Sequence, residues 1–385
     1  MKYKTAIVHE WLVNFAGSES VLEEIYKLYP SPIYTLIADK HAVGNSGISE
    51  AEIFTSFIQR LPFAKKKYRS YLPLYPMAIE NFDITDYDII LSSSHAVAKG
   101  VLKRSDQLHI CYCYTPMRYI WDIYHQYLRD SNLTKGLKSM IAKSFLHYLR
   151  LWDIASTNRV DYFIADSYYV ANRIKSIYRR DAEVIYPPVD IDSFELTEKK
   201  DDFYLTASRL VSYKKIDLIV EAFSRMKDKK LVVIGDGPQY NKIKRIATKN
   251  IEIIGHQPLY KLKGYMQNAR AFIFAALEDF GIMPVEAQAS GTPVIAYARG
   301  GACETVINNE TGLFFNDQSA EAIIEAVNEF ERIEHELDSK KIRGNALRFN
   351  RESFVKNYKN FVDKAIDEFY HSNLDNLSHH RFIEK

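Results

Sequence analysis

Short apolar runs separated by amphipathic segments recur through the first part of the chain. The runs have the length of buried strands, and they cover residues 4–12, 33–38, 87–94, 108–114 and 162–167. Residues 21–28 instead place apolar side chains at helical spacing, and Ser20 with Glu23 matches a capping box, so we expect a helix to start near Ser20. This alternation predicts an α/β domain with a parallel sheet and helices on both faces.

The pattern breaks at Pro187 and Pro188, which fit neither a helix nor a central strand and therefore indicate a domain linker. A second set of apolar runs then covers residues 202–208, 230–235, 251–255, 271–277 and 293–298. Helical spacing appears between them at 216–226 and 259–269, and again at 319–331. The sequence thus predicts two doubly wound Rossmann-like domains, residues 1–186 and 187–365, whose carboxyl edges face each other across a cleft.

The C-terminal segment has helical spacing with no strand after it. Phe354, Tyr358, Val362 and Phe369 would share one face of an amphipathic helix. The remaining residues, 366–385, are expected to form a tail that is free to pack back on the N-terminal domain.

Composition and charge narrow the class of protein. The 385 residues are 47% hydrophobic and 26% charged, which is typical of a folded chain, and a net charge of +2 does not indicate a nucleic-acid partner. Three cysteines are too few for a disulfide framework or a zinc site and fit a reducing compartment. The N-terminal apolar run is too short for a signal peptide, and no 18-residue apolar stretch predicts a transmembrane helix. We therefore expect a cytoplasmic protein.

The stretch EDFGIMPVEAQASG, residues 278–291, follows an apolar run and precedes a helical pattern. Glu278 is expected at the carboxyl end of a strand, and Gly281 allows the backbone to approach a ligand. Pro284 and Glu286 would fall in the first turn of the next helix, whose free N–H groups favour an anion. A structural loop with a carboxylate that complements the helix dipole is the alternative from the residues alone.

Cations follow the first predicted strand of the second domain. Arg209, Lys214 and Lys215 lie in one strand-to-helix loop, where they could neutralise a diphosphate, although a solvated helix start has the same composition. Gly17 and Ser18 in the first domain, and Gly235 in the second, lie in glycine-containing loops that suit phosphate but lack a full fingerprint.

Aromatic and basic side chains follow strands of the first domain. His95 comes directly after one strand, and Tyr114, Arg118 and Trp121 lie in an aromatic segment after the next, so these residues are candidates for the acceptor side of the cleft.

A basic stretch at residues 61–76 mixes charge with aromatic and aliphatic side chains. Its cations are Lys65, Lys66, Lys67 and Arg69. This composition suits either an anionic membrane surface, at the inner face of the cytoplasmic membrane, or a solvated surface helix.

Taken together, these segments resemble glycosyltransferase family four, whose members are retaining enzymes of the GT-B fold. The resemblance rests on ASRLVSYKKIDLIVEAF, VIGDGP, TGLFF and the E-x7-E pair formed by Glu278 and Glu286. In the first domain, AIVHEWL, SSSHAVAKGV and TPMRYIWD are similar to a bacterial mannosyltransferase subgroup. Two positions depart from the family: Ala16 stands where a second glycine is frequent, and Tyr114 stands where related enzymes often have a histidine.

The resemblance implies a role for each motif. Glu278 would contact hydroxyls of the donor sugar, and Glu286 would contact the ribose. The diphosphate would be held by Arg209, Lys214 and Lys215, by the segment Asp279, Phe280, Gly281 and Ile282, and by the loops of Gly17, Ser18 and Gly235. No metal or other cofactor would be needed, because these cations and amides replace it. Catalytic roles would fall to Glu278, Arg209, Lys214 and His95.

The implied reaction is transfer of a hexose, with mannose from GDP-mannose favoured, to a lipid-linked or growing polysaccharide acceptor. The same fold with a UDP-sugar donor is the alternative, because the base-binding backbone near 253–258 does not distinguish purine from pyrimidine. A sugar-nucleotide-binding subunit without activity would be expected to lack Glu278, Arg209 or Lys214, and all three are present.

Overall fold

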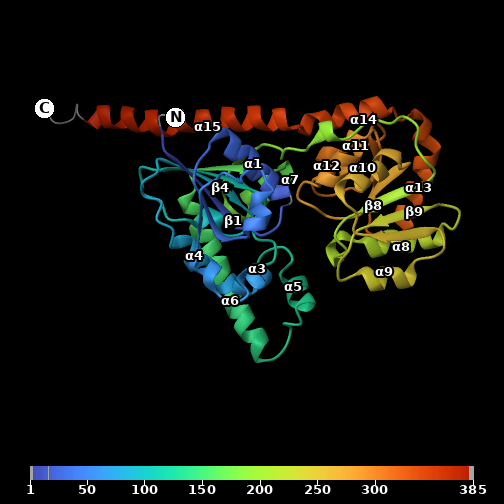
Figure 1. Ribbon diagram of the computed structural model, residues 1–385, viewed down its shortest axis with the longest axis horizontal. Coiled ribbons are helices and arrows are strands. Elements are labelled where there is room, and N and C mark those ends of the chain that lie inside the picture. The colour runs from blue at the N-terminus through green and yellow to red at the C-terminus, as the bar shows by residue number, and fades with distance from the viewer. Residues whose placement is uncertain (1–2, 16, 381–385) are drawn as a thin grey trace. The chain divides into compact units, whose positions relative to one another are not determined.

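The computed structural model describes residues 3–15 and 17–380, with side chains up to residue 370 (Figure 1). Clustering of contacts separates the chain into two compact units. The first contains the described residues up to Pro187 together with those from Phe354 onward, and the second is Pro188–Ser353. Each unit is an α/β domain built on one sheet.

The first unit contains a seven-stranded sheet, within the described residues, in the order β3-β2-β1-β4-β5-β6-β7. Every pairing in it is parallel. The strands are β1 (Thr5–Leu12), β2 (Ile33–Ala38), β3 (Ile53–Thr55), β4 (Ile89–Ser94), β5 (Leu108–Cys113), β6 (Tyr162–Ala165) and β7 (Ala182–Val184).

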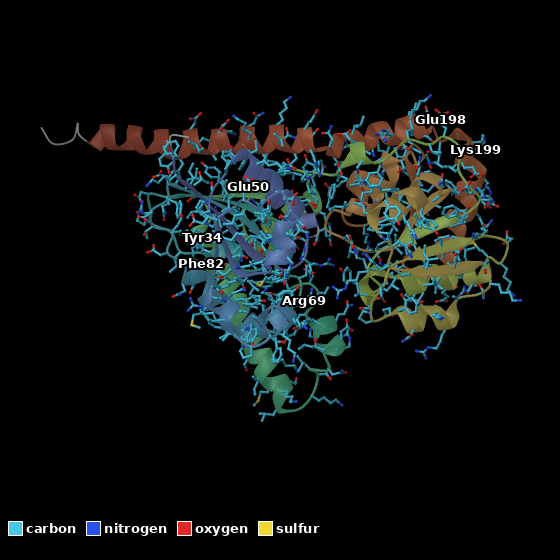
Figure 2. The ribbon with its side chains drawn as sticks, viewed as in Figure 1. Tyr34, Glu50, Arg69, Phe82, Glu198 and Lys199 are labelled. Atoms are coloured by element: carbon cyan, nitrogen blue, oxygen red, sulfur yellow. The ribbon has the colours of Figure 1, made fainter. Side chains whose placement is uncertain are left out.

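Alternate residues of each strand enter cores on opposite faces of this sheet. Val8 of β1 packs with α4 (Tyr75–Glu80) and α6 (Leu137–Ser156), whereas Ile7 packs with α1 (Gly17–Leu28) and α15 (Arg351–His380). Shorter helices of this unit are α2 (Lys40–Gly44), α3 (Ala64–Lys67), α5 (Tyr124–Asp130) and α7 (Tyr168–Tyr178). At the edge of the first core, the rings of Tyr34 and Phe82 meet edge to face, 5.4 Å apart (Figure 2).

The long helix α15 corrects the predicted end of the second domain. Phe354, Tyr358, Val362 and Ala365 are buried in the core of the first unit, and Tyr112 of β5 meets the Phe354 ring at 5.9 Å. Residues 354–365 were expected in the second domain, but their apolar stripe covers a face of the first sheet that would otherwise be exposed. Of the predicted tail, residues 366–370 continue this packing and 381–385 lie outside the described residues.

The second unit repeats the design with six strands, among the residues described, in the order β10-β9-β8-β11-β12-β13, again all parallel. They are β8 (Tyr204–Ala207), β9 (Leu231–Ile234), β10 (Ile251–Gly255), β11 (Ala271–Phe274), β12 (Val294–Tyr297) and β13 (Gly312–Phe315). The helices are α8 (Ile216–Arg225), α9 (Tyr240–Ile246), α10 (Leu259–Asn268), α11 (Ile282–Ala289), α12 (Ala302–Thr305), α13 (Ala320–Ile333) and α14 (Ser339–Ala346).

Three strands were not predicted, and one helix starts earlier than expected. Strands β3 and β7 have three residues each, too few to show a hydrophobic period, and β13 has four residues of which the first is a glycine. Helix α1 begins at Gly17 rather than near Ser20. The Glu23 carboxylate accepts a hydrogen bond from the Gly47 amide at 2.8 Å, so it is engaged by another loop and does not mark a helix start.

In both sheets the first strand lies where the strand order reverses. Strand β1 pairs with β2 on one side and β4 on the other, and β8 pairs likewise with β9 and β11. The connections on the two sides leave in opposite directions, which opens a crevice at the carboxyl ends of the strands. These two switch points are where ligand-binding side chains are expected.

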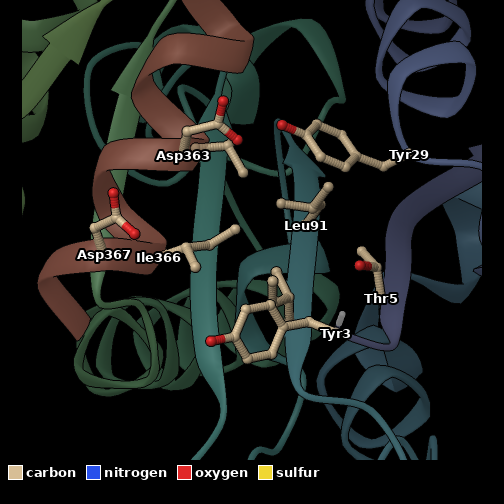
Figure 3. Close-up of a pocket in the computed structure, with 9 residues that line it drawn as sticks. Tyr3, Thr5, Tyr29, Leu91, Asp363, Ile366 and Asp367 are labelled. Carbon is tan, nitrogen blue, oxygen red and sulfur yellow. The ribbon is translucent and has the colours of Figure 1, made fainter. Parts of the chain in front are cut away.

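A cavity of about 450 Å³ lies at the opposite edge of the first sheet, between α15 and the starts of β1 and β4 (Figure 3). Thr5 and Ile89, the first residues of their strands, line it together with Tyr29 and Asp363. Its position separates it from the carboxyl ends of the strands and from every site residue predicted above.

Gly235 is expected to be essential for the second unit, because its φ of +141° is unfavourable for other residues and a Cβ would lie 1.8 Å from the carbonyl oxygen of Ser208. Gly235→Ala should lower stability by at least about 1–3 kcal/mol. Gly264→Ala, inside α10 with open space around its Cβ position, should be neutral or stabilising by up to about 1 kcal/mol. Thermal unfolding of both variants checks this, and equal melting temperatures would contradict it.

Candidate functional site

The loops that follow β8 and β11 meet at the switch point of the second unit. Lys214, in the loop after β8, forms an ion pair with Glu278, in the loop after β11, and both side chains are largely but not fully buried. The contact arises because β8 and β11 are neighbours in the sheet although more than 60 positions separate them in the sequence. A cation and a carboxylate thus lie side by side at the expected ligand-binding edge.

Helix α11 begins at Ile282, so a short loop separates it from Glu278, as the sequence predicted. Gly281 caps it with a φ of +90°, in the left-handed region that favours glycine. The N–H groups of the first residues of a helix have no partner within the helix, and the helix dipole makes this end positive. Asp279 and Ile282 are half-buried beside it, and Phe280 is buried against the Phe349 ring at 5.4 Å. This turn can accommodate a negatively charged ligand.

A second loop, which the sequence analysis assigned no role, braces the segment 278–281. The Gly301 amide donates to the carbonyl of Glu278 at 2.9 Å. A Cβ at Gly301 would lie 2.3 Å from the Cα of Phe280, and one at Gly300 would lie 2.4 Å from the carbonyl oxygen of Glu278. The two glycines after β12 therefore allow this close approach, and the hydrogen bond holds the backbone of Glu278 in place.

The other predicted residues of this unit differ in their environment. The exposed guanidinium of Arg209 forms no ion pair with any described residue, so it is available to an anion. Lys215 has a φ of +57° and caps α8. Gly235 belongs to the loop after β9, which hydrogen-bonds to the loop after β8 through the Leu210 amide and the Asp236 carbonyl at 2.9 Å.

Glu286 lies further along helix α11 than predicted. It is the fifth residue of α11 and therefore in the second turn, not the first. Burial raises the pKa of its carboxyl group to about 7, an effect that nearby Lys263 opposes and Asp190 reinforces. Near neutral pH this group can therefore donate or accept a proton in a hydrogen bond, which suits a hydroxyl-bearing ligand.

The switch point of the first unit contains a buried carboxylate that the sequence analysis did not single out. Glu10 of β1 is fully buried. Its Oε1 accepts hydrogen bonds from Ser94 Oγ at 2.9 Å and from the amides of His95, Ala96 and Ala98 at 2.9–3.1 Å. Burial would raise the pKa of Glu10, but His95, His9 and these amides together lower it below its usual value. Glu10 is therefore an anion, and although it belongs to β1 it lies beside the carboxyl end of β4.

His95 lies against this anion, with Nδ1 3.3 Å from Glu10 Oε2 and its ring edge to face with Trp11 at 4.6 Å. Burial lowers the pKa of His95, and Glu10 only partly offsets this. A neutral imidazole with Nδ1 facing a carboxylate keeps Nε2 as a proton acceptor. The predicted candidate His95 thus has a carboxylate partner that fixes its ring.

A second histidine, His9, lies beside this pair. Its Nδ1 is 3.1 Å from Ser93 Oγ, and its Nε2 is 3.7 Å from the Glu19 carboxylate of α1. Burial would lower the pKa of His9, but Glu19 and Glu10 outweigh it and raise the pKa above its usual value. Two adjacent ionisable residues within an otherwise apolar run, His9 and Glu10, were the sequence signal that could have revealed this cluster.

The predicted acceptor-side residues divide between two networks. The Tyr114 hydroxyl bonds to Ser93 Oγ and donates to the Ser18 carbonyl, both at 2.9 Å, so Tyr114 and the Gly17–Ser18 helix start join the histidine cluster. Trp121 instead donates to Asp153 at 2.8 Å, next to the buried Lys99–Asp153 ion pair. Arg118 is half-buried in the segment that leads to Trp121.

Comparison with known families identifies the second unit. Residues 189–347 match the family described as "Glycosyl transferases group 1". The match lies within the second unit and agrees with the resemblance found in the sequence.

Curated relatives match about half of the chain or less. An uncharacterized glycosyltransferase of Methanocaldococcus jannaschii is 29% identical over 202 residues, which are 50% of this chain and 57% of the relative. A GDP-mannose-dependent α-(1-6)-phosphatidylinositol monomannoside mannosyltransferase of Mycobacterium tuberculosis is 30% identical over 196 residues, 42% of this chain and 50% of the relative. The chain thus spans about half the length of these curated relatives.

Solved structures match nearly the whole chain. HepE of Anabaena in complex with UDP superposes with a TM-score of 0.67 at 16% identity, covering 94% of this chain and 100% of that one. Sucrose-phosphate synthase of Thermosynechococcus elongatus gives 0.72 at 15% identity, covering 94% and 99%. These likenesses establish the fold: two Rossmann-like domains with parallel sheets, as in GT-B glycosyltransferases.

The raised pKa of Glu286 predicts a pH-dependent difference in stability. The folded chain holds this proton more tightly than the unfolded chain, so the stabilisation is present below the usual value of 4.5 and is lost as the pH rises to about 7. Glu286→Gln removes this titrating group, so the melting temperature of the variant should rise relative to that of the unmodified chain as the pH increases between these values. Glu310→Gln, exposed in the same unit, is the control. A constant difference across the range would show that Glu286 titrates normally.

Proposed function

We propose that this protein is a retaining glycosyltransferase that transfers a hexose, in the first instance mannose from GDP-mannose, to a lipid-linked or growing polysaccharide acceptor. The observation that carries the proposal is the Lys214–Glu278 pair beside the N-terminal end of α11. The group 1 family match of the second unit supports glycosyl transfer. The named mannosyltransferases among the relatives, from M. tuberculosis and yeast, support mannose as the sugar.

In this proposal the donor diphosphate lies at the start of α11. Its charge is balanced by Lys214, by the exposed Arg209 and by the helix N–H groups, in place of a divalent cation. The diphosphate competes with Glu278 for Lys214, so donor binding loosens the ion pair and frees the Glu278 carboxylate. Glu278 then accepts hydrogen bonds from hydroxyls of the sugar, and Glu286 contacts the ribose.

Transfer with retention needs no protein nucleophile in this scheme. The bond from the anomeric carbon to the diphosphate breaks while the acceptor oxygen attacks the same face of the sugar. The acceptor proton passes to the leaving diphosphate oxygen. The contribution of the protein is to stabilise the negative charge that builds on that diphosphate, and neither Glu278 nor Glu286 acts as the nucleophile of a glycosidase.

The first unit would supply the acceptor side. His95, held by Glu10, and the segment from Tyr114 to Trp121 follow the strands at its switch point. A neutral His95 can accept a hydrogen bond from an acceptor hydroxyl.

We place the reaction in the cytoplasm. Among the described residues no helix is long and apolar enough to cross a bilayer.

Thermal-shift measurements with GDP, GDP-mannose, UDP and UDP-glucose test the donor assignment, because a ligand that binds the folded state raises its melting temperature. GDP and GDP-mannose should each raise it, by an amount that corresponds to about 2.7 kcal/mol at one hundred times Kd, and the shift should persist in EDTA. A rise in melting temperature with UDP and UDP-glucose alone would contradict GDP-mannose as the donor and indicate a UDP-sugar donor. A shift that EDTA abolishes and Mn²⁺ restores would contradict the metal-free diphosphate site.

A further inference from the structure

Helix α6 of the first unit presents apolar side chains on two opposite faces. Its inner face places Leu146, Leu149 and Trp152 in the core. Its outer face exposes large apolar side chains to solvent. The most exposed are Leu137 (67%), Met140 (60%), Ile141 (61%), Tyr148 (52%) and Leu151 (60%). A helix on the surface of a globular protein ordinarily turns polar side chains outward.

The exposed side chains form one continuous stripe. With 3.6 residues per turn, their positions fall within an arc of roughly 100° that points away from the buried face. Single exposed apolar residues are common on proteins, but a contiguous exposed patch marks an interaction surface. The stripe runs along most of α6, which projects from its unit (Figure 1).

The charged residues within the segment that carries the stripe have one sign up to Arg150. Residues 131–152 contain no Asp or Glu, whereas Lys135, Lys138 and Lys143 are exposed. The next acid, Asp153, is buried and paired with Lys99, so it offers no charge to the surface. The helix therefore has an apolar face flanked by cations, and its partner should be both apolar and anionic.

The basic stretch singled out in the sequence extends this surface. Lys66, Lys67 and Arg69 are exposed, and Phe63 is 72% exposed beside them. A cavity of about 350 Å³ is lined by Arg69 and Leu72 together with Lys138 and Ile141, which shows that the two segments are neighbours. Arg69 lies at this end of the unit, near α3 (Figure 2). Two separate segments thus contribute cations and apolar side chains to one surface.

We propose that this surface, formed by the outer face of α6 and by residues 63–69, inserts into the headgroup region of an anionic lipid bilayer. Hydrocarbon accepts the exposed Leu, Ile and Met side chains, and lipid phosphates pair with the flanking Lys and Arg groups. A second copy of the chain fits poorly, because pairing this surface with itself would place like charges together. The proposal does not depend on the transfer chemistry, although a lipid-linked acceptor would be met at such a surface.

Co-sedimentation of the full chain with vesicles tests the proposal. The chain should bind vesicles that contain phosphatidylglycerol, bind phosphatidylcholine vesicles much more weakly, and dissociate as salt rises. The triple variant Leu137→Ser, Ile141→Ser and Leu151→Ser should bind phosphatidylglycerol vesicles at least about tenfold more weakly, because three apolar side chains no longer enter the bilayer. The matched control is Leu259→Ser with Tyr260→Ser, which alters exposed apolar residues of the second unit and should leave binding unchanged.

A separate charge variant, Lys66→Glu with Lys138→Glu, should weaken binding to anionic vesicles without lowering the melting temperature, because both side chains are exposed. Equal vesicle binding by the triple variant and the unmodified chain would overturn the insertion of α6. Equal binding to neutral and anionic vesicles would overturn the role of the cations. If the unmodified chain ignores vesicles but sediments as a dimer that the triple variant disrupts, a second copy covers the surface and the proposal is wrong.

Discussion

The reversal of strand order beside β1 and β8 is the constraint on which the rest of the structure depends. Because a parallel sheet brings the carboxyl ends of neighbouring strands to one edge, residues far apart in sequence become neighbours there without long loops. In the second unit this places Lys214 against Glu278. In the first unit it places Glu10 of β1 under His95, which follows β4. The candidate residues of each unit thus arise from the same topological feature.

The two switch points use charge differently. The second unit keeps Arg209 exposed and engages Lys214 with a carboxylate that a ligand can displace, so its positive charge is available to an incoming anion. The first unit buries its charges: Glu10 accepts four hydrogen bonds at one oxygen, which offsets the cost of removing a carboxylate from water. A buried group so fully engaged is suited to hold His95 and not to bind a ligand. Our proposal therefore places donor binding in the second unit, and in the first unit it gives Glu10 the role of holding His95 for the acceptor side.

The sequence predicted the parallel sheets, because short apolar runs alternated with segments of helical spacing. It also predicted Glu278, Gly281 and Lys214 as loop residues at strand ends. It missed β3 and β7, which have only three residues each, and β13, whose four residues begin with a glycine. It placed residues 354–365 in the second domain, because an amphipathic stripe does not reveal which sheet it will cover. It also overlooked Glu10 and the bracing Gly300–Gly301, whose importance depends on contacts between distant segments.

The central claim is that Lys214 and Glu278 form the donor site, and sugar transfer by point variants measures it most directly. The account predicts that Lys214→Met and Glu278→Gln each lower kcat/KM by about 10²–10³-fold with the melting temperature retained, as loss of one charge-stabilising contact does. Lys242→Met, which removes an exposed ion pair with Asp217 in the same unit, should leave transfer unchanged. Full activity in the Lys214 and Glu278 variants would contradict the account.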